Sequence, residues 1–379
     1  MLAQYAGSNR CFLPAIVFDF TAPAQGRVID SIRYDRPHGA LRAPSLMKLG
    51  LDLFSLRSQN WSAFELLDYS ANLGVQVAHF SEPRFLGGVD PSHLDQIKAH
   101  ADRLDLELEV GFASICETSQ RFEPEHGTPV EQLRRMFQVA RRLDSPIVRC
   151  FLGNSKDREG PIALERHIEN TIKSCKAVRS EALDLGLKIA IENHAGDLQS
   201  HQLRMLIEEA GPEYVGALYD AGNAAWTLED PLLALETLAP HILTSGIRDS
   251  AIWEVPEGAA VQWVPMGAGN VDIDQVARRY AELCPDKVFS LEIINTRTPR
   301  IFAYWKEAFW ENYRDVPAGV FTHLMRRARL GSPYEDVPTG PPDSSSDSPA
   351  FKQFLVDQER RDVEQAVGYC RNKLGFGRG

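Results

Sequence analysis

The sequence predicts an α/β protein, a (β/α)8 or TIM barrel with a C-terminal helical extension. Eight short runs of strand character follow one another between residues 48 and 293. Amphipathic stretches of helical period separate these runs, the alternation that is typical of parallel β/α units. Eight such units in about 250 residues match the usual size of this barrel.

The expected strands come first in chain order. They are residues 48–55, 75–80, 106–112, 146–153, 187–193, 214–220, 241–247 and 287–293. Several of the intervening helical stretches end in a glycine that favours a helix C-cap, namely Gly74, Gly186 and Gly211. A doubly wound open sheet is the alternative, and a G-x-G-x-x-G turn after the first strand would favour it. The residues there are "FSLRSQN", so the barrel is preferred.

The regions outside residues 47–298 differ from the barrel pattern. Residues 1–46 mix Gly, Pro, Arg and small polar residues without periodicity. They are either a genuine irregular N-terminal arm or sequence upstream of a true start at Met47. Residues 299–379 read as a helical extension with a Ser/Pro-rich break at 338–349. This extension is expected to cap the barrel mouth or to form a subunit contact, so a homo-oligomer is left open.

Composition narrows the class of protein and partner. The chain has 379 residues and a net charge of −11, which argues against nucleic acid and against an anionic membrane surface as partners. Apolar runs stay well short of the roughly 20 residues that span a bilayer. Six scattered cysteines without a C-x-x-C pair suit a reducing compartment. A cytoplasmic protein with a small-molecule partner is therefore expected.

Carboxylates end three of the expected strands. In this kind of barrel the active site lies at the carboxyl ends of the strands. Glu192 ends the fifth run, Asp220 the sixth and Glu292 the eighth. Three converging carboxylates repel one another unless a cation or shared protons offset the repulsion. A divalent ion with oxygen ligands is the simplest solution.

Four motifs resemble one family in this order. "LKIAIENHAG", "YVGALYDAGN", "VPMGAGNVDIDQV" and "FSLEII" are similar to motifs of the xylose isomerase-like TIM-barrel superfamily, over about residues 47–295. That superfamily includes sugar isomerases and epimerases, inosose dehydratases and endonuclease IV. The resemblance implies a metal held by Glu192, Asp220, a strand-seven His and Glu292. Here the His position of the H-[IVL]-[KR]-D pattern is Gly246, and the frequent D-x-x-H of strand six ends in Asn223.

The resemblance also implies a mechanism. A divalent ion (Mn, Mg, Co or Zn) polarises the carbonyl of a keto-sugar or sugar derivative and so acidifies the neighbouring C–H. Glu192 and Glu292 then form the acid/base pair of an isomerase or epimerase. The missing imidazoles put the coordination of the metal in doubt. They also argue against nuclease activity, which uses several His ligands in this superfamily.

Further polar residues are candidates for binding a sugar or sugar acid. His194 follows Glu192 by two residues and is expected to bind substrate, to transfer a proton or to support Glu192. Asn223 and His79 are substrate-binding candidates, with a structural hydrogen bond as the alternative for His79. Arg149 offers a bidentate donor to a carboxylate or phosphate if it faces inward, and pairing with one of the chain's many acidic residues is the alternative. Arg248 is similar, with Asp249 as its expected orienting partner.

Two other functions stay open at this stage. A lyase, either a dehydratase or a decarboxylase, would use the same intermediate on an oxidised sugar or sugar acid. A metal-free, catalytically degraded barrel that acts as a binding or partner subunit would explain the glycine at position 246. The sequence leaves the substrate, the metal and the subunit number undetermined.

Overall fold

The computed structural model describes residues 47–296, 298–336 and 348–377. The expected N-terminal arm and positions 338–347 of the expected break lie outside the described residues. The domain boundaries and the expected start at Met47 therefore stay predictions.

All eight expected barrel strands form, and they make one parallel sheet in the order β10-β1-β2-β3-β4-β5-β6-β7. An isolated parallel bridge between Ile247 and Leu291 joins the two end strands and closes the barrel. The barrel strands are β1 (Leu49–Asp52), β2 (Val77–Phe80), β3 (Glu107–Ser114), β4 (Ile147–Phe151), β5 (Lys188–Glu192), β6 (Val215–Asp220), β7 (Ile242–Gly246) and β10 (Phe289–Leu291).

Helices surround the barrel, and local sequence signals explain where several of them begin and end. Ser62 and Thr128 open helices with reciprocal capping boxes, in which the side chain of the residue three positions later binds back to the cap. Gly186 ends another helix in the left-handed conformation, as its sequence position predicts. The helices are α1 (Ala63–Asn72), α2 (Pro91–Arg103), α3 (Pro129–Leu143), α4 (Ser155–Arg158), α5 (Leu164–Ala177), α6 (Arg179–Leu185), α7 (Ser200–Ala210), α8 (Ala221–Ala225), α9 (Pro231–Leu238) and α10 (Ile273–Leu283).

Short 3-10 helices complete the connections, and they are η1 (Leu53–Leu56), η2 (Pro83–Leu86), η3 (Pro124–His126) and η4 (Ala239–His241). The strands are buried along nearly their whole length, so one apolar core fills the space between barrel and helices. Among the described residues, no helix combines the length and the apolar character needed to cross a membrane.

A β-hairpin that the sequence reading did not predict follows β7 directly. Its strands β8 (Asp249–Val255) and β9 (Gly258–Val264) pair antiparallel, and β11 (Arg300–Phe302) adds to β9. Asp249 accepts hydrogen bonds from the backbone N–H groups of Gly267, at 2.9 Å, and Gly269, at 3.0 Å. The expectation that Asp249 orients Arg248 is therefore wrong, because this carboxylate holds the turn after β9.

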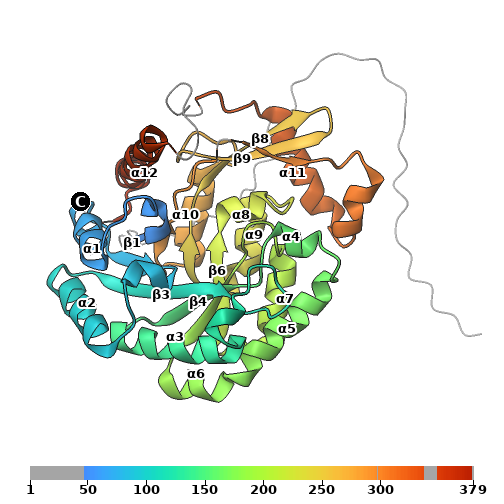
Figure 1. Ribbon diagram of the computed structural model, residues 1–379. Helices are drawn as coiled ribbons and strands as arrows, with labels where there is room; N and C mark the ends of the chain where they lie inside the picture. Colours follow the sequence, from blue (N-terminus) through green and yellow to red (C-terminus); the bar gives the residue numbers. More distant parts are fainter. Residues whose placement is uncertain (1–46, 297, 337–347, 378–379) are drawn as a thin grey trace, which may run out of the picture. The chain divides into compact units, whose positions relative to one another are not determined.

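The C-terminal extension packs against the barrel and the hairpin. Phe302 is buried and Phe309 packs against it, whereas Trp305 is 67% exposed. The last long helix contacts the loop after β1, where Glu359 accepts a hydrogen bond from Ser58 N at 2.9 Å. In Figure 1 this helix stands beside α1. The elements are η5 (Glu307–Asn312), α11 (Ala318–Leu330), α12 (Pro349–Tyr369) and the π-helical turn η6 (Cys370–Leu374).

Candidate active site

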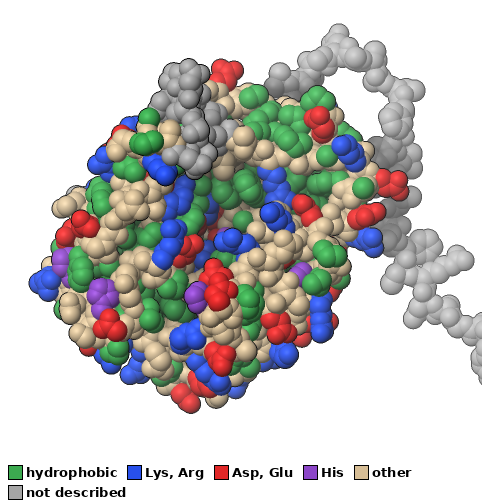
Figure 2. Space-filling model, viewed as in Figure 1, with side chains coloured by type: hydrophobic (Ala, Val, Ile, Leu, Met, Phe, Trp, Pro, Cys, Tyr) green, Lys and Arg blue, Asp and Glu red, His purple; other side chains and the backbone are tan. Residues whose placement is uncertain are grey.

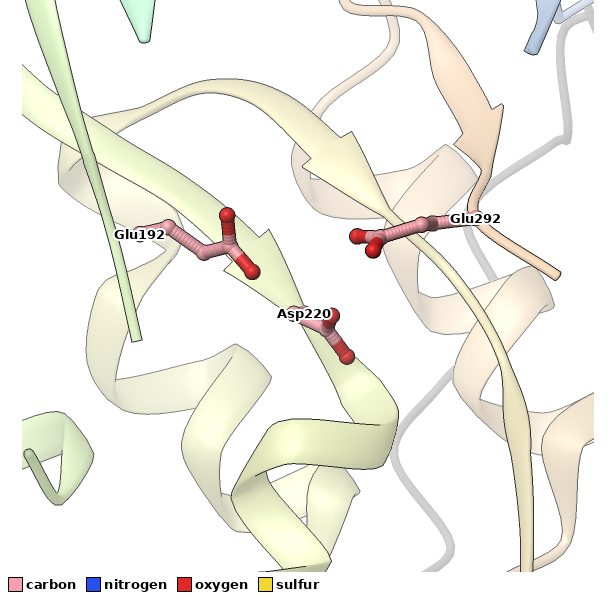
Figure 3. Close-up of side chains that lie close together, drawn as sticks. All are labelled: Glu192, Asp220 and Glu292. Carbon is pink, nitrogen blue, oxygen red and sulfur yellow. The ribbon is translucent and has the colours of Figure 1, made fainter. Parts of the chain in front are cut away.

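Three carboxylates meet at the carboxyl end of the barrel (Figure 3). Glu192 ends β5, Asp220 ends β6 and Glu292 directly follows β10. One carboxylate oxygen from each lies within 4.8 Å of the others. Glu192 and Asp220 are completely buried, and Glu292 is 6% exposed. The three side chains that the strand ends predicted are therefore brought together, at a spacing where they could bind one metal ion.

Two buried arginines face these carboxylates. Arg149, on β4, donates from Nε to Glu192 Oε2 at 2.7 Å. Arg248, two residues beyond β7, lies with Nη2 2.6 Å from Glu292 Oε2 and also donates to Asp220 Oδ2. The site thus contains two guanidinium cations among three carboxylates. Arg149 faces inward, and its partner there is an acidic residue, Glu192, which is the alternative given for this arginine.

Asn223 joins two of the carboxylates. Its Nδ2 donates to Glu192 Oε1 at 2.9 Å and to Asp220 Oδ2 at 2.8 Å. Its backbone N–H also donates to Asp220 Oδ1 at 2.9 Å, because Asp220 is the N-cap of α8. An amide group at this position separates carboxylates that would otherwise repel each other.

Burial and charge shift the pKa values of the site in opposite directions. Burial raises the pKa of Asp220 to about 8, and the neighbouring Arg248 opposes that rise. Burial lowers the pKa of Arg248, but Asp220 and Glu292 outweigh it and leave that pKa raised. The pKa of Arg149 is raised in the same way, by Glu192 above all, against the effect of burial. Both arginines therefore stay charged.

A tryptophan of the unpredicted hairpin covers the guanidinium group of Arg248. The guanidinium carbon lies 4.3 Å from the ring centroid of Trp263, on β9. Trp263 stacks in turn on Trp226 at 4.0 Å and donates from Nε1 to the Gly222 carbonyl oxygen at 3.0 Å. Sequence reasoning missed Trp263, because the hairpin stands where a barrel usually has only a loop.

His194 lies at the rim of the same site. Its ring stacks on Phe151, with 3.9 Å between centroids, and its Nδ1 donates to the Gly153 carbonyl oxygen at 2.6 Å. Burial, with Arg149 nearby, lowers the pKa of His194 to about 3, so the imidazole is neutral. These contacts fix the ring, and its role in substrate binding stays a prediction.

His79 belongs to a separate group inside the barrel. It is completely buried, with Nδ1 3.6 Å from Asp52 Oδ2 and 3.9 Å from Glu109 Oε2. Neither of its ring nitrogens has a hydrogen-bond partner among the described residues. Burial lowers the pKa of His79 to about 3. The structure does not place His79 in contact with the three carboxylates, and its proposed contact with substrate stays a prediction.

Gly246 ends β7 on the side that faces the carboxylates. A Cβ atom built on it would lie 3.3 Å from Glu292 Oε2 and 3.6 Å from Asp220 Oδ2. A side chain at this position would therefore point into the site, as the family pattern implies for its strand-seven His.

The remaining contacts decide whether a divalent ion fits. Five of the six carboxylate oxygens already face an N–H donor. These donors belong to Arg149, Asn223 and Arg248. Only Glu292 Oε1 has no donor among the described residues. The spacing of the triad suits a metal, but its oxygens are already used by fixed donors, so the donor set does not fit one.

Comparisons with known proteins agree with this fold. A family model described as xylose isomerase-like TIM barrel matches residues 67–310. The uncharacterized protein YihM of Escherichia coli (strain K12) is 26% identical over 321 residues, 82% of this chain and 84% of YihM.

Two solved structures share the fold at low identity. A D-psicose 3-epimerase crystallised with D-fructose has a TM-score of 0.55 at 14% identity, covering 87% of this chain and 100% of its own. The IOLI protein with a bound zinc atom has a TM-score of 0.53 at 16% identity, covering 73% of this chain and 99% of its own. At such identities these likenesses show the fold alone.

Proposed function

Because the chain belongs to the xylose isomerase-like TIM-barrel family, we propose that it is an isomerase or epimerase acting on a keto-sugar or sugar derivative. Members of this superfamily are mostly enzymes, and the epimerase of the same fold supports the choice of substrate class. The reaction proposed is the removal of a proton next to a carbonyl group, followed by its return to a different position or face.

The observation that carries this proposal is the free oxygen of Glu292. Glu192 accepts hydrogen bonds at both oxygens, and so does Asp220. Glu292 is bound at Oε2 only, and it is the most exposed of the three. A general base must reach the proton that it removes, and Glu292 Oε1 is the carboxylate atom available for that contact.

Glu292 Oε1 takes the proton from the carbon next to the carbonyl, and the electron pair of that C–H bond moves to form an enediolate. If Glu292 returns the proton to the former carbonyl carbon, and the hydroxyl proton of the first carbon passes to the former carbonyl oxygen, the product is an isomer. If water supplies a proton to the opposite face of the first carbon and Glu292 passes its own proton to water, the product is an epimer. Both oxygens of Glu192 accept hydrogen bonds, from Arg149 and Asn223, so Glu192 has no free oxygen for this step. No step passes through a metal ion, because the donor set described above does not fit one.

A cavity of about 740 Å³ borders the site at Arg149 and is the proposed place for the substrate. Arg149 and Phe151 form part of its wall, together with Phe112 and the exposed Arg121. Aromatic rings and guanidinium groups suit a polyhydroxylated or anionic sugar. Figure 2 shows Lys and Arg side chains around the hollowed middle of the face that it presents.

Proton exchange in D2O tests the proposed reaction. The protein is incubated with a panel of keto-sugars and sugar acids, and the products are followed by NMR. Deuterium incorporation with an unchanged molecular formula is expected. Loss of water or CO2 would instead support the lyase, and exchange with none of the compounds would support a binding subunit.

Glu292→Gln tests the assigned base in the same assay. The exchange rate should fall at least about 100-fold, because the amide cannot accept the proton. Glu282→Gln, an exposed position on α10, is the matched control and should keep the wild-type rate. Substantial exchange by a folded Glu292→Gln variant would refute the assignment.

A further inference from the structure

We propose that the Arg248 guanidinium takes the place of a divalent metal ion in this site. The cation that the carboxylates require is then built into the chain. The catalytic part of this inference rests on the proposed function, whereas its structural part does not.

The position of the Nη2 atom is the first observation. Nη2 lies 2.6 Å from Glu292 Oε2 and in hydrogen-bond contact with Asp220 Oδ2. A metal ion shared by these two carboxylates would need to stand about 2.0–2.2 Å from each oxygen. An atom that already touches both oxygens occupies that place.

The ligand set is the second observation. Gly246 and Asn223 are two further positions that face the carboxylates. Asn223 presents its Nδ2 donor to the carboxylates, and its Oδ1 is left without a hydrogen-bond partner. A cation among the carboxylates needs oxygen or nitrogen lone pairs. Asn223 turns its Nδ2 donor, and not its Oδ1 acceptor, toward the carboxylates, and Gly246 has no side chain, so neither position supplies a lone pair there.

The charges are the third observation. Arg149 and Arg248 bring two positive charges to three carboxylates, and both guanidinium groups are buried. A divalent ion would be added beside two buried cations, and their repulsion is strong where water is excluded. The two arginines therefore supply the compensation that a metal would otherwise give.

The fold is shaped to hold Arg248 in this position. A Cβ atom on Gly222 would lie 2.2 Å from Arg248 Cγ, so only glycine leaves room for this side chain. Trp263 also covers the guanidinium, with its ring centroid 4.3 Å from the guanidinium carbon. A side chain that had to move away to admit a metal ion would not be expected to be held by such close contacts.

Arg248 still has donors to offer to a substrate. Its Nε is buried without a hydrogen-bond partner, and its Nη1 donates to no described residue. A carbonyl oxygen that gains negative charge during proton removal is stabilised by such fixed donors. Arg248 and the free Oε1 of Glu292 thus provide the electrophile and the base side by side.

Metal binding is the direct test, and it needs no substrate. The protein is stripped with EDTA and titrated with Mn²⁺, and free Mn²⁺ is followed by electron paramagnetic resonance. The wild type should show no saturable binding. The Gly246→His/Arg248→Ala variant should bind one Mn²⁺ per chain, because it empties the position and restores an imidazole. Saturable binding by the wild type would overturn the proposal, as would a folded double variant that binds none.

The rate of exchange in D2O is the second test of the role of Arg248. Wild-type exchange in D2O should be unaffected by EDTA and by added Mn²⁺. Arg248→Ala should lose about 100-fold or more in rate, and added guanidinium chloride should restore part of that rate. Arg279→Ala, a partly exposed position on α10 that pairs with Glu236 and Glu282, is the control and should show neither effect. A wild-type rate that EDTA abolishes and Mn²⁺ restores would overturn the proposal.

The two proposals fail in different ways. If no sugar exchanges protons, the proposed function falls, whereas the Mn²⁺ titration still decides the role of Arg248. If the wild type binds Mn²⁺, only the inference about Arg248 falls.

Discussion

Two glycines leave the space that the side chains of Arg149 and Arg248 occupy in the candidate site. A Cβ on Gly111 would lie 2.9 Å from Arg149 Cβ, and a Cβ on Gly222 would lie 2.2 Å from Arg248 Cγ. Real Cβ atoms do not approach that closely, so each glycine permits an arginine to run along the strand end. The absence of a side chain is therefore as specific a feature of this site as the charged groups are.

Gly222→Ala should displace Arg248, because the added methyl group overlaps the arginine stem. We expect the variant to lose about 1–3 kcal/mol in free energy of unfolding, the usual cost of overpacking. Its deuterium exchange rate should also fall, since Arg248 can no longer contact Asp220 and Glu292 together. Urea unfolding and the D2O assay measure the two effects.

Gly319→Ala is the matched control for this substitution. Gly319 lies in the first turn of α11, and a Cβ there would meet nothing within 4 Å. This variant should be as stable as the wild type or slightly more so. Equal free energies of unfolding for Gly222→Ala and Gly319→Ala would contradict the close contact assigned to Gly222 and Arg248.

At the scale of elements, the hairpin and α12 add contacts that the barrel strands and helices do not make themselves. The hairpin brings Trp263 over the site, and α12 holds the loop after β1. Glu359 is 6% exposed, and it accepts from Ser58 N at 2.9 Å and Ser58 Oγ at 2.8 Å. One carboxylate therefore fastens the helix to the rim of the barrel.

Glu359→Ala should loosen α12, because two donors of Ser58 lose their acceptor. We expect a loss of about 1–3 kcal/mol and faster amide exchange in residues 349–369, measured by mass spectrometry. Glu364→Ala is the control, since this exposed carboxylate accepts a single hydrogen bond within the described part of the chain, from the Tyr69 hydroxyl at 2.9 Å. If amide exchange in α12 is the same in Glu359→Ala and Glu364→Ala, the role assigned to Glu359 is wrong.

Sequence patterns predicted the elements of the barrel better than the contacts of the site. Apolar runs and strand-end carboxylates suffice to place Glu192, Asp220 and Glu292 at one mouth. Which donors those carboxylates meet depends on side chains from other strands, which only the closed barrel brings together. Arg149 was a candidate donor to a substrate, with pairing to an acidic residue of the chain as the alternative, and the structure pairs it with Glu192.

At the scale of the whole molecule, the barrel buries charge at a cost in stability. Glu109 lies on β3 and accepts a hydrogen bond from Thr244 on β7 at 2.8 Å. Burial raises its pKa from 4.5 to about 7, against the effect of that hydrogen bond. The folded protein therefore holds a proton here between pH 4.5 and 7 that the unfolded chain releases. Stability must fall as the pH rises through this window.

Glu109→Gln removes this titration while keeping an acceptor for Thr244. Relative to the wild type, the variant should gain up to about 3 kcal/mol in free energy of unfolding between about pH 5 and about pH 8. Urea unfolding at the two pH values measures the change. Glu107→Gln, an exposed carboxylate on the same strand that pairs with Lys48, should show no such gain. A pH dependence identical in all three proteins would mean that Glu109 is ionised in the folded barrel throughout this range.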